Sequence, residues 1–201
     1  MIALIDYGIG NLRSVQKALS TVGADVLLTD EPDKILTADK VVLPGVGAFG
    51  DGMAGLISRQ LDGVLQVLNE QRKPLLGICL GMQLLFDSSE ELGEHPGLGF
   101  LPGKVIRFKS NDLKIPHTGW NQIHTENLSP LLHGLEPGSY AYFNHSFYCS
   151  PELPTDVLAS TEYGLKYASV VGRGHLYGVQ FHPEKSQSVG LKMLHNFVEG
   201  C

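Results

Sequence analysis

The chain has 201 residues, of which 43% are hydrophobic and 18% charged, a balance typical of a globular protein with its own hydrophobic core. Fifteen basic and 21 acidic residues give a formal net charge of −6, which argues against a nucleic acid or an anionic membrane as partner. Three cysteines at no metal-ligand spacing predict reduced thiols in the cytoplasm. There is no apolar run of about 18 residues and no basic start typical of a signal peptide. Collagen-like, disordered, membrane-spanning and disulfide-rich secreted proteins are therefore excluded.

The first half of the chain alternates short apolar runs with helical patterns. Four runs, which we expect to be buried strands, span residues 2–5, 26–28, 41–43 and 75–78. Helical spacing appears at residues 12–22 before Gly23, at residues 56–68, and at residues 80–86. Such alternation is typical of a parallel sheet covered by helices on both faces.

The second half contains closely spaced strand-like runs between residues 104 and 179. We expect hairpins with turns at Gly119, Pro130, Gly138, Gly164 and residues 172–174. A helix is predicted at residues 188–198, and residues 87–103 are predicted to be a surface loop. Because no linker divides the halves, we expect a single domain over residues 1–201. The predicted fold class is α/β, a flavodoxin-like three-layer sandwich whose mostly parallel central sheet gains antiparallel strands in the second half.

The most specific local feature is a cysteine between two glycines, where a predicted strand runs directly into a predicted helix. Cys79 has Gly77 and Gly81 on either side, which is the nucleophile-elbow pattern with sulfur in place of a hydroxyl. Such a corner forces a rare backbone conformation and leaves no room for neighbouring side chains. A helix N-terminus favours the thiolate, and the N–H of Leu80 can donate to an oxyanion. The alternative is a buried, inert cysteine between packing glycines.

A nucleophile requires a base, and His182 is the best candidate among eight histidines. It follows the last apolar run and stands two residues before Glu184. Residues i and i+2 of an extended segment point to the same side, so Glu184 can orient the imidazole. Pro183 keeps His182 extended. A lone histidine is more often structural, and it is the combination with Cys79 that indicates a Cys-His-Glu triad.

Two other glycine clusters invite comparison with nucleotide-binding loops. Residues 45–50 match G-x-G-x-x-G, but the next predicted strand ends in Cys79 rather than in an acidic residue. Residues 8–13 carry Arg13 at the place of the third glycine. We therefore expect both clusters to present bare backbone N–H groups at a reaction centre, and no nucleotide.

Taken together, these motifs resemble the class I (triad) glutamine amidotransferases. More narrowly, they are similar to the glutaminase subunits of imidazole glycerol phosphate synthases. The stretches that carry the resemblance are DYGIGNL at residues 6–12, LPGVGAF at 43–49, GICLGMQ at 77–83, PHTGWN at 116–121, YFNHS at 142–146 and FHPEKS at 181–186. They are spread over nearly the whole chain.

The resemblance implies a role for each matching residue. Cys79 would attack the side-chain amide of glutamine, His182 would move the protons, and Glu184 would hold the imidazole. The N–H groups of Val46 and Leu80 would form the oxyanion hole. The residues that match the glutamine-binding positions are Gly47, Gln83, Ser146 and Phe147.

The resemblance also implies a partner. Ammonia would pass to a (β/α)8-barrel cyclase subunit, forming a heterodimer that makes imidazole glycerol phosphate and aminoimidazole carboxamide ribotide in histidine biosynthesis. No cofactor and no metal is implied. The residues that match the subunit interface are Asn11, Trp120, Tyr142 and Lys185, although Trp120 and Tyr142 alone are equally consistent with ordinary packing.

Two departures and two alternatives accompany this interpretation. The family usually has an apolar residue where Asn144 stands and tyrosine where Phe147 stands, which affects the pocket rim rather than the chemistry. The triad is also consistent with a glutaminase for a pyridoxal phosphate or anthranilate synthase, but residues 6–12 and 116–121 favour the imidazole glycerol phosphate type. A different class would be a non-enzymatic flavodoxin-like binding module in which Cys79 is inert.

Overall fold

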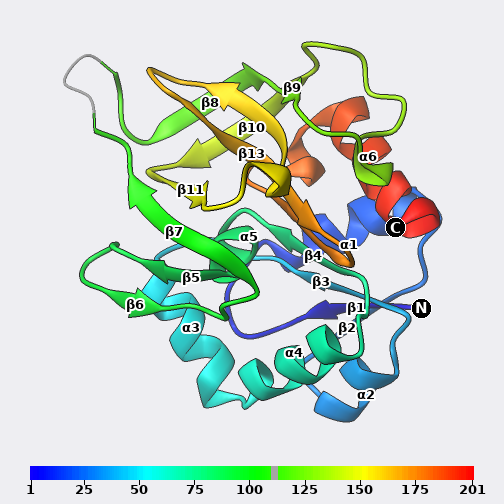
Figure 1. Cartoon of the computed structure of the whole chain (residues 1–201). Coiled ribbons are helices and arrows are strands. Elements are labelled where there is room, and N and C mark those ends of the chain that lie inside the picture. The colour runs from blue at the N-terminus through cyan, green and yellow to red at the C-terminus, as the bar shows by residue number, and fades with distance from the viewer. Residues whose placement is uncertain (110–112) are drawn as a thin grey trace.

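A computed structural model of the chain describes residues 1–109 and 113–201. Five parallel strands form one half of its main sheet, in the order β2-β1-β3-β4-β14. They are β1 (Ile2–Ile5), β2 (Val26–Thr29), β3 (Lys40–Leu43), β4 (Leu75–Ile78) and β14 (Leu176–Val179). The first four contain the apolar runs that the sequence predicts, and their carboxyl ends meet at one edge of the sheet (Figure 1).

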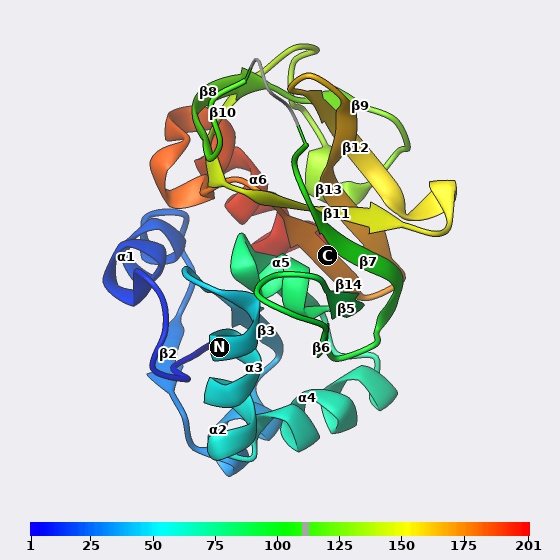
Figure 2. The same ribbon diagram turned by 90° about the vertical axis from the view of Figure 1, so that its left-hand side faces the viewer.

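The same sheet continues through mostly antiparallel strands, in the order β13-β11-β7-β5-β6, while β12 pairs with β13 and β9 pairs with β12. These strands are β5 (Phe86–Ser89), β6 (His95–Pro96), β7 (Leu101–Arg107), β9 (His124–Thr125), β11 (Phe147–Pro151), β12 (Val157–Glu162) and β13 (Lys166–Arg173). A separate antiparallel pair consists of β8 (His117–Gln122) and β10 (Tyr140–His145), and lies above α1 and beside α6 (Figure 2).

Helices cover both faces of the sheet. One face carries α1 (Leu12–Thr21) and α6 (Gln187–Gly200), and the other carries α2 (Pro32–Thr37), α3 (Phe49–Ser58) and α4 (Leu61–Glu70) (Figure 1). The short helix α5 (Leu80–Leu84) follows β4, and three 3-10 turns lie at η1 (Pro130–Leu132), η2 (Pro154–Asp156) and η3 (Pro183–Lys185). A separate buried apolar cluster lies on each face of the sheet. The predicted α/β class, mostly parallel with added antiparallel strands, is confirmed.

Several predicted elements have different bounds from those expected. The single helix expected at residues 56–68 is interrupted, because Gln60 has a left-handed backbone (φ 58°) that separates α3 from α4. The helix expected to reach residue 86 ends at Leu84, and the loop expected at residues 87–103 contains strands β5 and β6 and the start of β7. Ser89 is buried there although it is polar, so hydrophobicity alone does not reveal the strand. The short helix α2 was not predicted.

The predicted turns are partly wrong. Gly138, Gly164 and Gly174 lie in turns or bends with positive φ, and Pro130 begins η1. Gly119, by contrast, lies inside β8, opposite Phe143. Gly172 lies inside β13, where a Cβ would come within 2.6 Å of Leu158 Cδ1. Gly172 thus reflects close packing within a strand, whereas Gly119 has open space around it and a positive φ of 139° inside its strand.

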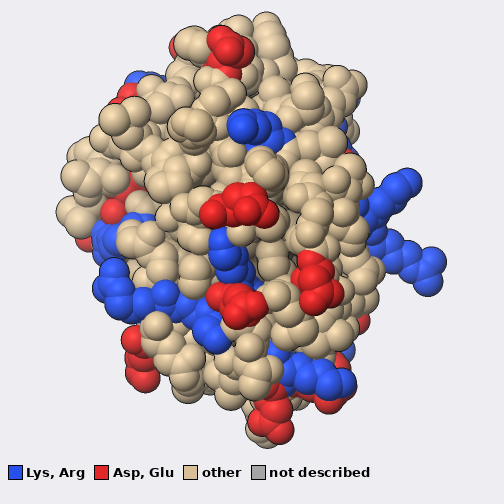
Figure 3. Space-filling view, turned by 90° about the vertical axis from the view of Figure 1, so that its right-hand side faces the viewer, with Lys and Arg blue, Asp and Glu red and all other residues tan. Residues whose placement is uncertain are grey.

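The surface over α1 and α6 carries acidic residues beside basic ones (Figure 3). The longest helix, α6, has 14 residues. Among the described residues, no helix is long and apolar enough to cross a membrane.

Candidate active site

The sheet itself brings the predicted nucleophile and base together. Strands β4 and β14 are parallel neighbours with Ile78 opposite Val179, so Cys79 and His182 leave the same edge of the sheet. The N–H of Cys79 continues this pairing and donates to the carbonyl of Val179 over 2.8 Å. The position of the two side chains therefore depends on strand register rather than on long loops.

The backbone at Cys79 has the rare conformation expected of an elbow, with φ 55° and ψ −110°. A Cβ at Gly77 would come within 2.6 Å of the carbonyl oxygen of Gly81, and a Cβ at Gly81 would overlap the carbonyl oxygen of Leu43. Non-glycine residues in this region of backbone space cost about 1–3 kcal/mol, a strain that the surrounding packing must hold. Cys79 is 6% exposed, and the amide Nε2 of Gln180 lies 4.0 Å from its sulfur.

His182 is oriented by Glu184. Its Nδ1 lies 3.0 Å from Glu184 Oε1, and both side chains are buried. Since a carboxylate only accepts, Nδ1–H donates and Nε2 is left to face the thiol. Burial lowers the pKa of His182, but hydrogen bonds and charge interactions with Cys79 and Glu184 outweigh burial and raise it above its ordinary value. This arrangement favours a protonated imidazole beside the Cys79 sulfur.

The backbone of His182 is held by Ser186, which the sequence motifs include but do not assign a role. Ser186 Oγ donates to the carbonyl of His182 over 2.7 Å and accepts from the N–H of Tyr142 at 2.9 Å. The N–H of His182 in turn donates to the carbonyl of Tyr142 over 3.0 Å. The base is thus attached to β10, a strand with a predicted interface residue.

A cavity of about 230 Å³ opens beside Cys79 and His182. Every residue predicted to bind glutamine or to form the oxyanion hole lines it, and Glu184 lies behind His182. The full lining is Val46, Gly47, Cys79, Leu80, Gln83, Glu91, Pro116, Asn144, His145, Ser146, Phe147 and His182. Asn144, one of the two departures from the family pattern, is therefore part of the pocket wall.

Glu91 is a pocket residue that the sequence reasoning missed. It lies in the segment between β5 and β6, which was expected to be a plain surface loop. Its Oε2 accepts from the N–H of Phe49 at 2.7 Å, at the start of α3. The carboxylate thus joins this segment to the end of the glycine loop at residues 44–47. No local motif marks Glu91, because tertiary folding alone brings it to the pocket.

The glycine loop at residues 44–47 lies over the elbow. Gly47 has φ +100°, and the hydroxyl of buried Tyr7 donates to the carbonyl of Pro44 over 2.6 Å. The N–H of Leu80, predicted as an oxyanion donor, makes a long 3.4 Å contact with the carbonyl of Gly45. Val46, the other predicted donor, is 41% exposed. If the N–H of Leu80 is to donate to an oxyanion, the oxyanion has to replace the Gly45 carbonyl as its acceptor.

Three of the four predicted interface residues lie together. The rings of Trp120 and Tyr142 face outward from the β8–β10 pair with centroids 6.0 Å apart, and Lys185 Nζ lies 5.7 Å from the Tyr142 ring centroid. Trp120 is 47% exposed. Asn11 is exposed at the start of α1, a helix that contacts η3.

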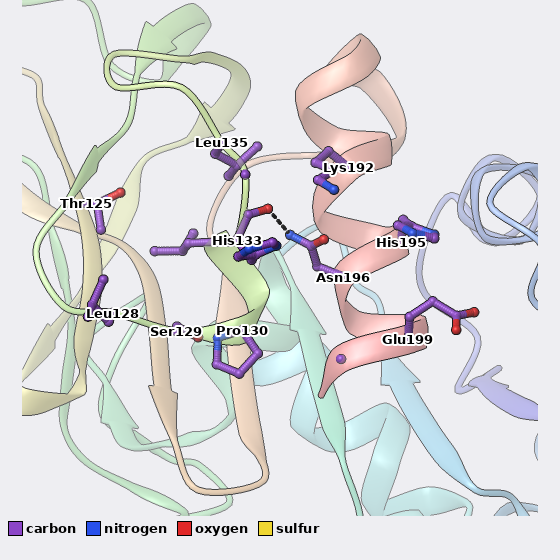
Figure 4. Close-up of a pocket in the computed structure, with 13 residues that line it drawn as sticks. Thr125, Leu128, Ser129, Pro130, His133, Leu135, Lys192, His195, Asn196 and Glu199 are labelled. Carbon is purple, nitrogen blue, oxygen red and sulfur yellow. Dashed lines mark hydrogen bonds between the residues drawn. The ribbon is translucent and has the colours of Figure 1, made fainter.

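A larger cavity of about 790 Å³ lies away from the triad, between α6 and the segment around η1 (Figure 4). Its polar lining includes His133, Lys192, His195 and Glu199. Asn196 donates its Nδ2 to the carbonyls of Leu131 and His133, which joins the two walls. The lining holds no thiol, so this cavity does not fit the chemistry of Cys79. Among residues 1–109 and 113–201, no group of three or more potential metal ligands is present.

Comparison with known proteins agrees with this geometry. The family model for glutamine amidotransferase class-I matches residues 3–201, and the chain belongs to that family. Two solved structures share the fold. A chain described as a glutamine amidotransferase has a TM-score of 0.77 at 18% identity, with 99% of this chain and 98% of that one covered. The PurLQS structure from Thermotoga maritima has a TM-score of 0.75 at 19% identity, with 98% and 96% covered.

Sequence relatives are more specific. The chain is 52% identical to the imidazole glycerol phosphate synthase subunit HisH of Methanosarcina acetivorans, over 100% of this chain and 98% of that protein. It is 50% identical to the HisH subunit of Moorella thermoacetica, over 98% and 94% of the two chains. It is 48% identical to that of Bacillus subtilis, over 99% and 96%.

Proposed function

We propose that the chain is the glutaminase subunit of an imidazole glycerol phosphate synthase, and that it hydrolyses glutamine through Cys79, His182 and Glu184 in histidine biosynthesis. The observation that carries this proposal is the Cys79–His182–Glu184 arrangement at the wall of the 230 Å³ cavity. Full-length identity of about half to named HisH subunits supports the same reaction and the same pathway.

The reaction begins with attack of Cys79 Sγ on the side-chain amide carbon of glutamine. The tetrahedral intermediate collapses as His182 gives a proton to the leaving nitrogen, so that ammonia departs and a glutamyl thioester remains. His182 then takes a proton from water, which attacks the thioester and releases glutamate and the thiolate. Glu184 holds the imidazole orientation through both steps.

Glutamine recognition is assigned to the cavity wall. Gln83 uses Nε2 for both of its hydrogen bonds, to the carbonyl of Phe147 and to Gln180 Oε1, which leaves its Oε1 for the α-ammonium group. The carboxylate of Glu91 supplies a negative charge for the same group. Backbone N–H groups of Gly47, Ser146 and Phe147 would bind the α-carboxylate, and the N–H groups of Val46 and Leu80 would bind the oxyanion.

The product of the reaction, ammonia, indicates what kind of partner the chain needs. Ammonia must reach an electrophile before bulk water protonates it, and we assign that step to a (β/α)8-barrel cyclase subunit. The surface formed by Asn11, Trp120, Tyr142 and Lys185 is the proposed docking site. We further propose a single domain over residues 1–201 that acts in the cytoplasm, which the three free cysteines support.

The test is glutamine hydrolysis with and without a ligand-loaded cyclase subunit. We expect slow hydrolysis by the isolated chain and much faster hydrolysis in the complex. Cys79→Ala should abolish hydrolysis while synthesis from added ammonium salt continues. Retained hydrolysis in this variant would overturn the mechanism. If the chain binds and is stimulated by a different synthase only, the reaction stands and the pathway assignment fails.

A separate test addresses the docking site. Trp120→Ala should weaken the complex with the cyclase about tenfold or more, since exposed aromatic residues often dominate interfaces. Leu128→Ala is the matched control, because Leu128 is 98% exposed but outside the proposed surface. Equal affinities for the two variants would place the cyclase elsewhere.

A further inference from the structure

Two buried histidines, His145 in the cavity wall and His117 behind it, have no part in the proposed triad. His117 and His145 are cross-strand partners in the β8–β10 pair, and they are 3% and 6% exposed. Side chains alternate along a strand, so these rings point inward while Trp120 and Tyr142 point outward. The same two strands thus carry the proposed docking site on one face and the histidine pair on the other.

The hydrogen bonds of the pair run in one direction. Asn121 Nδ2, which only donates, lies 3.4 Å from His117 Nε2, so the proton of that ring is on Nδ1. His117 Nδ1 lies 3.3 Å from His145 Nε2. His145 Nδ1 lies 2.7 Å from the carbonyl oxygen of Phe147, which only accepts. One set of tautomers, with both rings neutral and protonated on Nδ1, therefore satisfies every contact from Asn121 to Phe147.

The surroundings keep both rings in this state. His117 is stacked between Tyr163 and Phe143, with ring centroids 3.9 and 5.0 Å away. Burial lowers the pKa of His117 to about 4, and burial also lowers that of His145, to about 3. The hydroxyl of Tyr167 lies 3.2 Å from His117 Nδ1 and 3.3 Å from His145 Nε2, and completes the cluster.

The chain of hydrogen bonds ends on the glutamine side of the cavity. The carbonyl of Phe147 that accepts from His145 also accepts from Gln83 Nε2 at 3.2 Å. The neighbouring carbonyl of Ser146 accepts from the N–H of Phe108 at 3.1 Å. These hydrogen bonds thus fix the peptide groups at residues 146–147, and the same residues line the cavity.

We propose that His145, oriented by His117, is a positioning residue for glutamine binding. Its Nδ1–H fixes the Phe147 carbonyl and, through it, the side chain of Gln83 and the turn at residues 144–147. The inference rests on the proposed glutaminase function and concerns the amino-acid end of glutamine rather than the scissile amide. Its loss should therefore raise KM for glutamine more than it lowers kcat.

Three substitutions at one position separate donation from packing. In His145→Asn the side-chain amide occupies the place of Nδ1 and keeps a donor to Phe147. His145→Gln extends its amide to the place of Nε2 instead, and His145→Leu has no donor. We expect KM to rise about tenfold in the Gln and Leu variants, and to stay within about threefold of the parent in the Asn variant.

Two further variants keep the test decisive. His117→Phe retains a ring between Tyr163 and Phe143 but removes the bond to His145, and should give an intermediate KM even if the Leu variant does not fold. His175→Leu is the matched control, because His175 is partly buried and bonded to Asn69 Oδ1 at 2.9 Å, away from the cavity. Its KM should match that of the parent.

The readouts are steady-state kinetics of the complex with the ligand-loaded cyclase, thermal melting, and alkylation of Cys79 by iodoacetamide. Iodoacetamide does not use the amino-acid subsite, so its rate should be unchanged in every folded variant. An unchanged KM in His145→Leu, or an equal loss in the Asn and Leu variants, would overturn the positioning role. If the parent complex itself does not hydrolyse glutamine, the proposed function fails instead.

Discussion

The charge of Glu184 determines how His182 behaves. The imidazole is buried, and burial alone would keep it neutral. Interactions with the Cys79 sulfur, and with the Glu184 carboxylate 3.0 Å away, reverse that preference and raise the pKa of His182. The buried Glu184 carboxylate thus favours the protonated form of the ring, and it also selects the tautomer of the ring.

Glu184→Gln tests this role. The amide oxygen still accepts from His182 Nδ1, but the negative charge is lost, so the pKa of His182 should fall. We expect kcat for glutamine to drop by roughly 10²-fold with little change in KM. The measurement is hydrolysis by the complex as a function of pH. Glu199→Gln, which alters an acid at the distant cavity, should leave the rate unaltered. A Glu184→Gln variant with the kcat of the parent would contradict the assignment.

At the level of single residues, the local sequence predicts a site residue only where a sequence motif also has a direct chemical meaning. Cys79 could be selected because the glycines beside it indicate a tight strand-to-helix corner. His182 and Glu184 could be selected because a His-x-Glu pair in an extended segment places the carboxylate beside the imidazole. Glu91 could not, because its place in the cavity depends on the path of β5 and β6. Ser186 and His145 lie in quoted stretches, but their contacts depend on how β10 packs against η3 and β8.

Among the elements, the β4–α5 elbow shows one of the close approaches between backbone segments. Its glycines allow α5 to lie against the end of β3, where the Leu43 carbonyl occupies the space of a missing side chain at Gly81. This contact between backbones explains why the strand-to-helix corner has no freedom to relax.

Gly81→Ala should therefore destabilise the protein by about 2 kcal/mol or more and reduce hydrolysis, since the added methyl must move the Leu43 backbone. Gly63→Ala is the matched control. Gly63 is exposed inside α4 with nothing within 4 Å of its added Cβ, and alanine there should stabilise by about 0.5–1 kcal/mol. Urea unfolding with both variants measures the difference. Equal stabilities would mean that the corner is looser than described.

The strands that were missed share a physical cause. Prediction from apolar runs finds β1, β3 and β4 because the apolar side chains on both faces of these strands are buried, and it finds β2 although its apolar residues are only partly buried. Strand β5 has Asp87 exposed and a buried serine, and α2 has only Ile35 fully buried. Such segments are stabilised by pairing with β7 or by packing on α4, contacts that a single sequence does not display.

For the molecule as a whole, the aromatic cluster around His117 and His145 links the main sheet to the β8–β10 pair. Phe108 and Tyr167 of this cluster contact both histidine rings, and Phe143 continues it to Phe181 beside the triad. The cluster is apolar apart from its hydrogen bonds, so it tolerates neutral histidines and disfavours charged ones.

This gives a pH dependence of stability. The two histidines have pKa values lowered from 6.5 to about 4 and about 3, so the unfolded chain binds more protons below pH 6.5. Stability should fall as pH drops from 6.5 to about 4, by up to about 1.4 kcal/mol per pH unit for each ring. His182, whose pKa is raised, does not oppose this, because its contribution is complete below pH 6.5 and is lost only at higher pH.

Urea unfolding between pH 7 and pH 4 measures this slope. Tyr163, Tyr167 and His182 are the ionisable neighbours of the two rings, and burial raises the pKa of Tyr167 so that it stays neutral throughout. His145→Asn removes one titrating ring while keeping its donor, and should make the slope shallower by about 1.4 kcal/mol per pH unit. An identical slope in the two proteins would show that other groups dominate.

The register between β4 and β14 has one more consequence. Cys79 and His182 follow two neighbouring strands of the sheet, β4 and β14. The groups that would hold the carbonyl oxygen and the amino-acid end of glutamine come instead from the segments at residues 44–47 and 144–147. The residues that generate the nucleophile and the residues that would bind the substrate thus belong to different parts of the fold. A partner could therefore govern turnover by acting on these two segments, without rearranging the strands that carry Cys79 and His182.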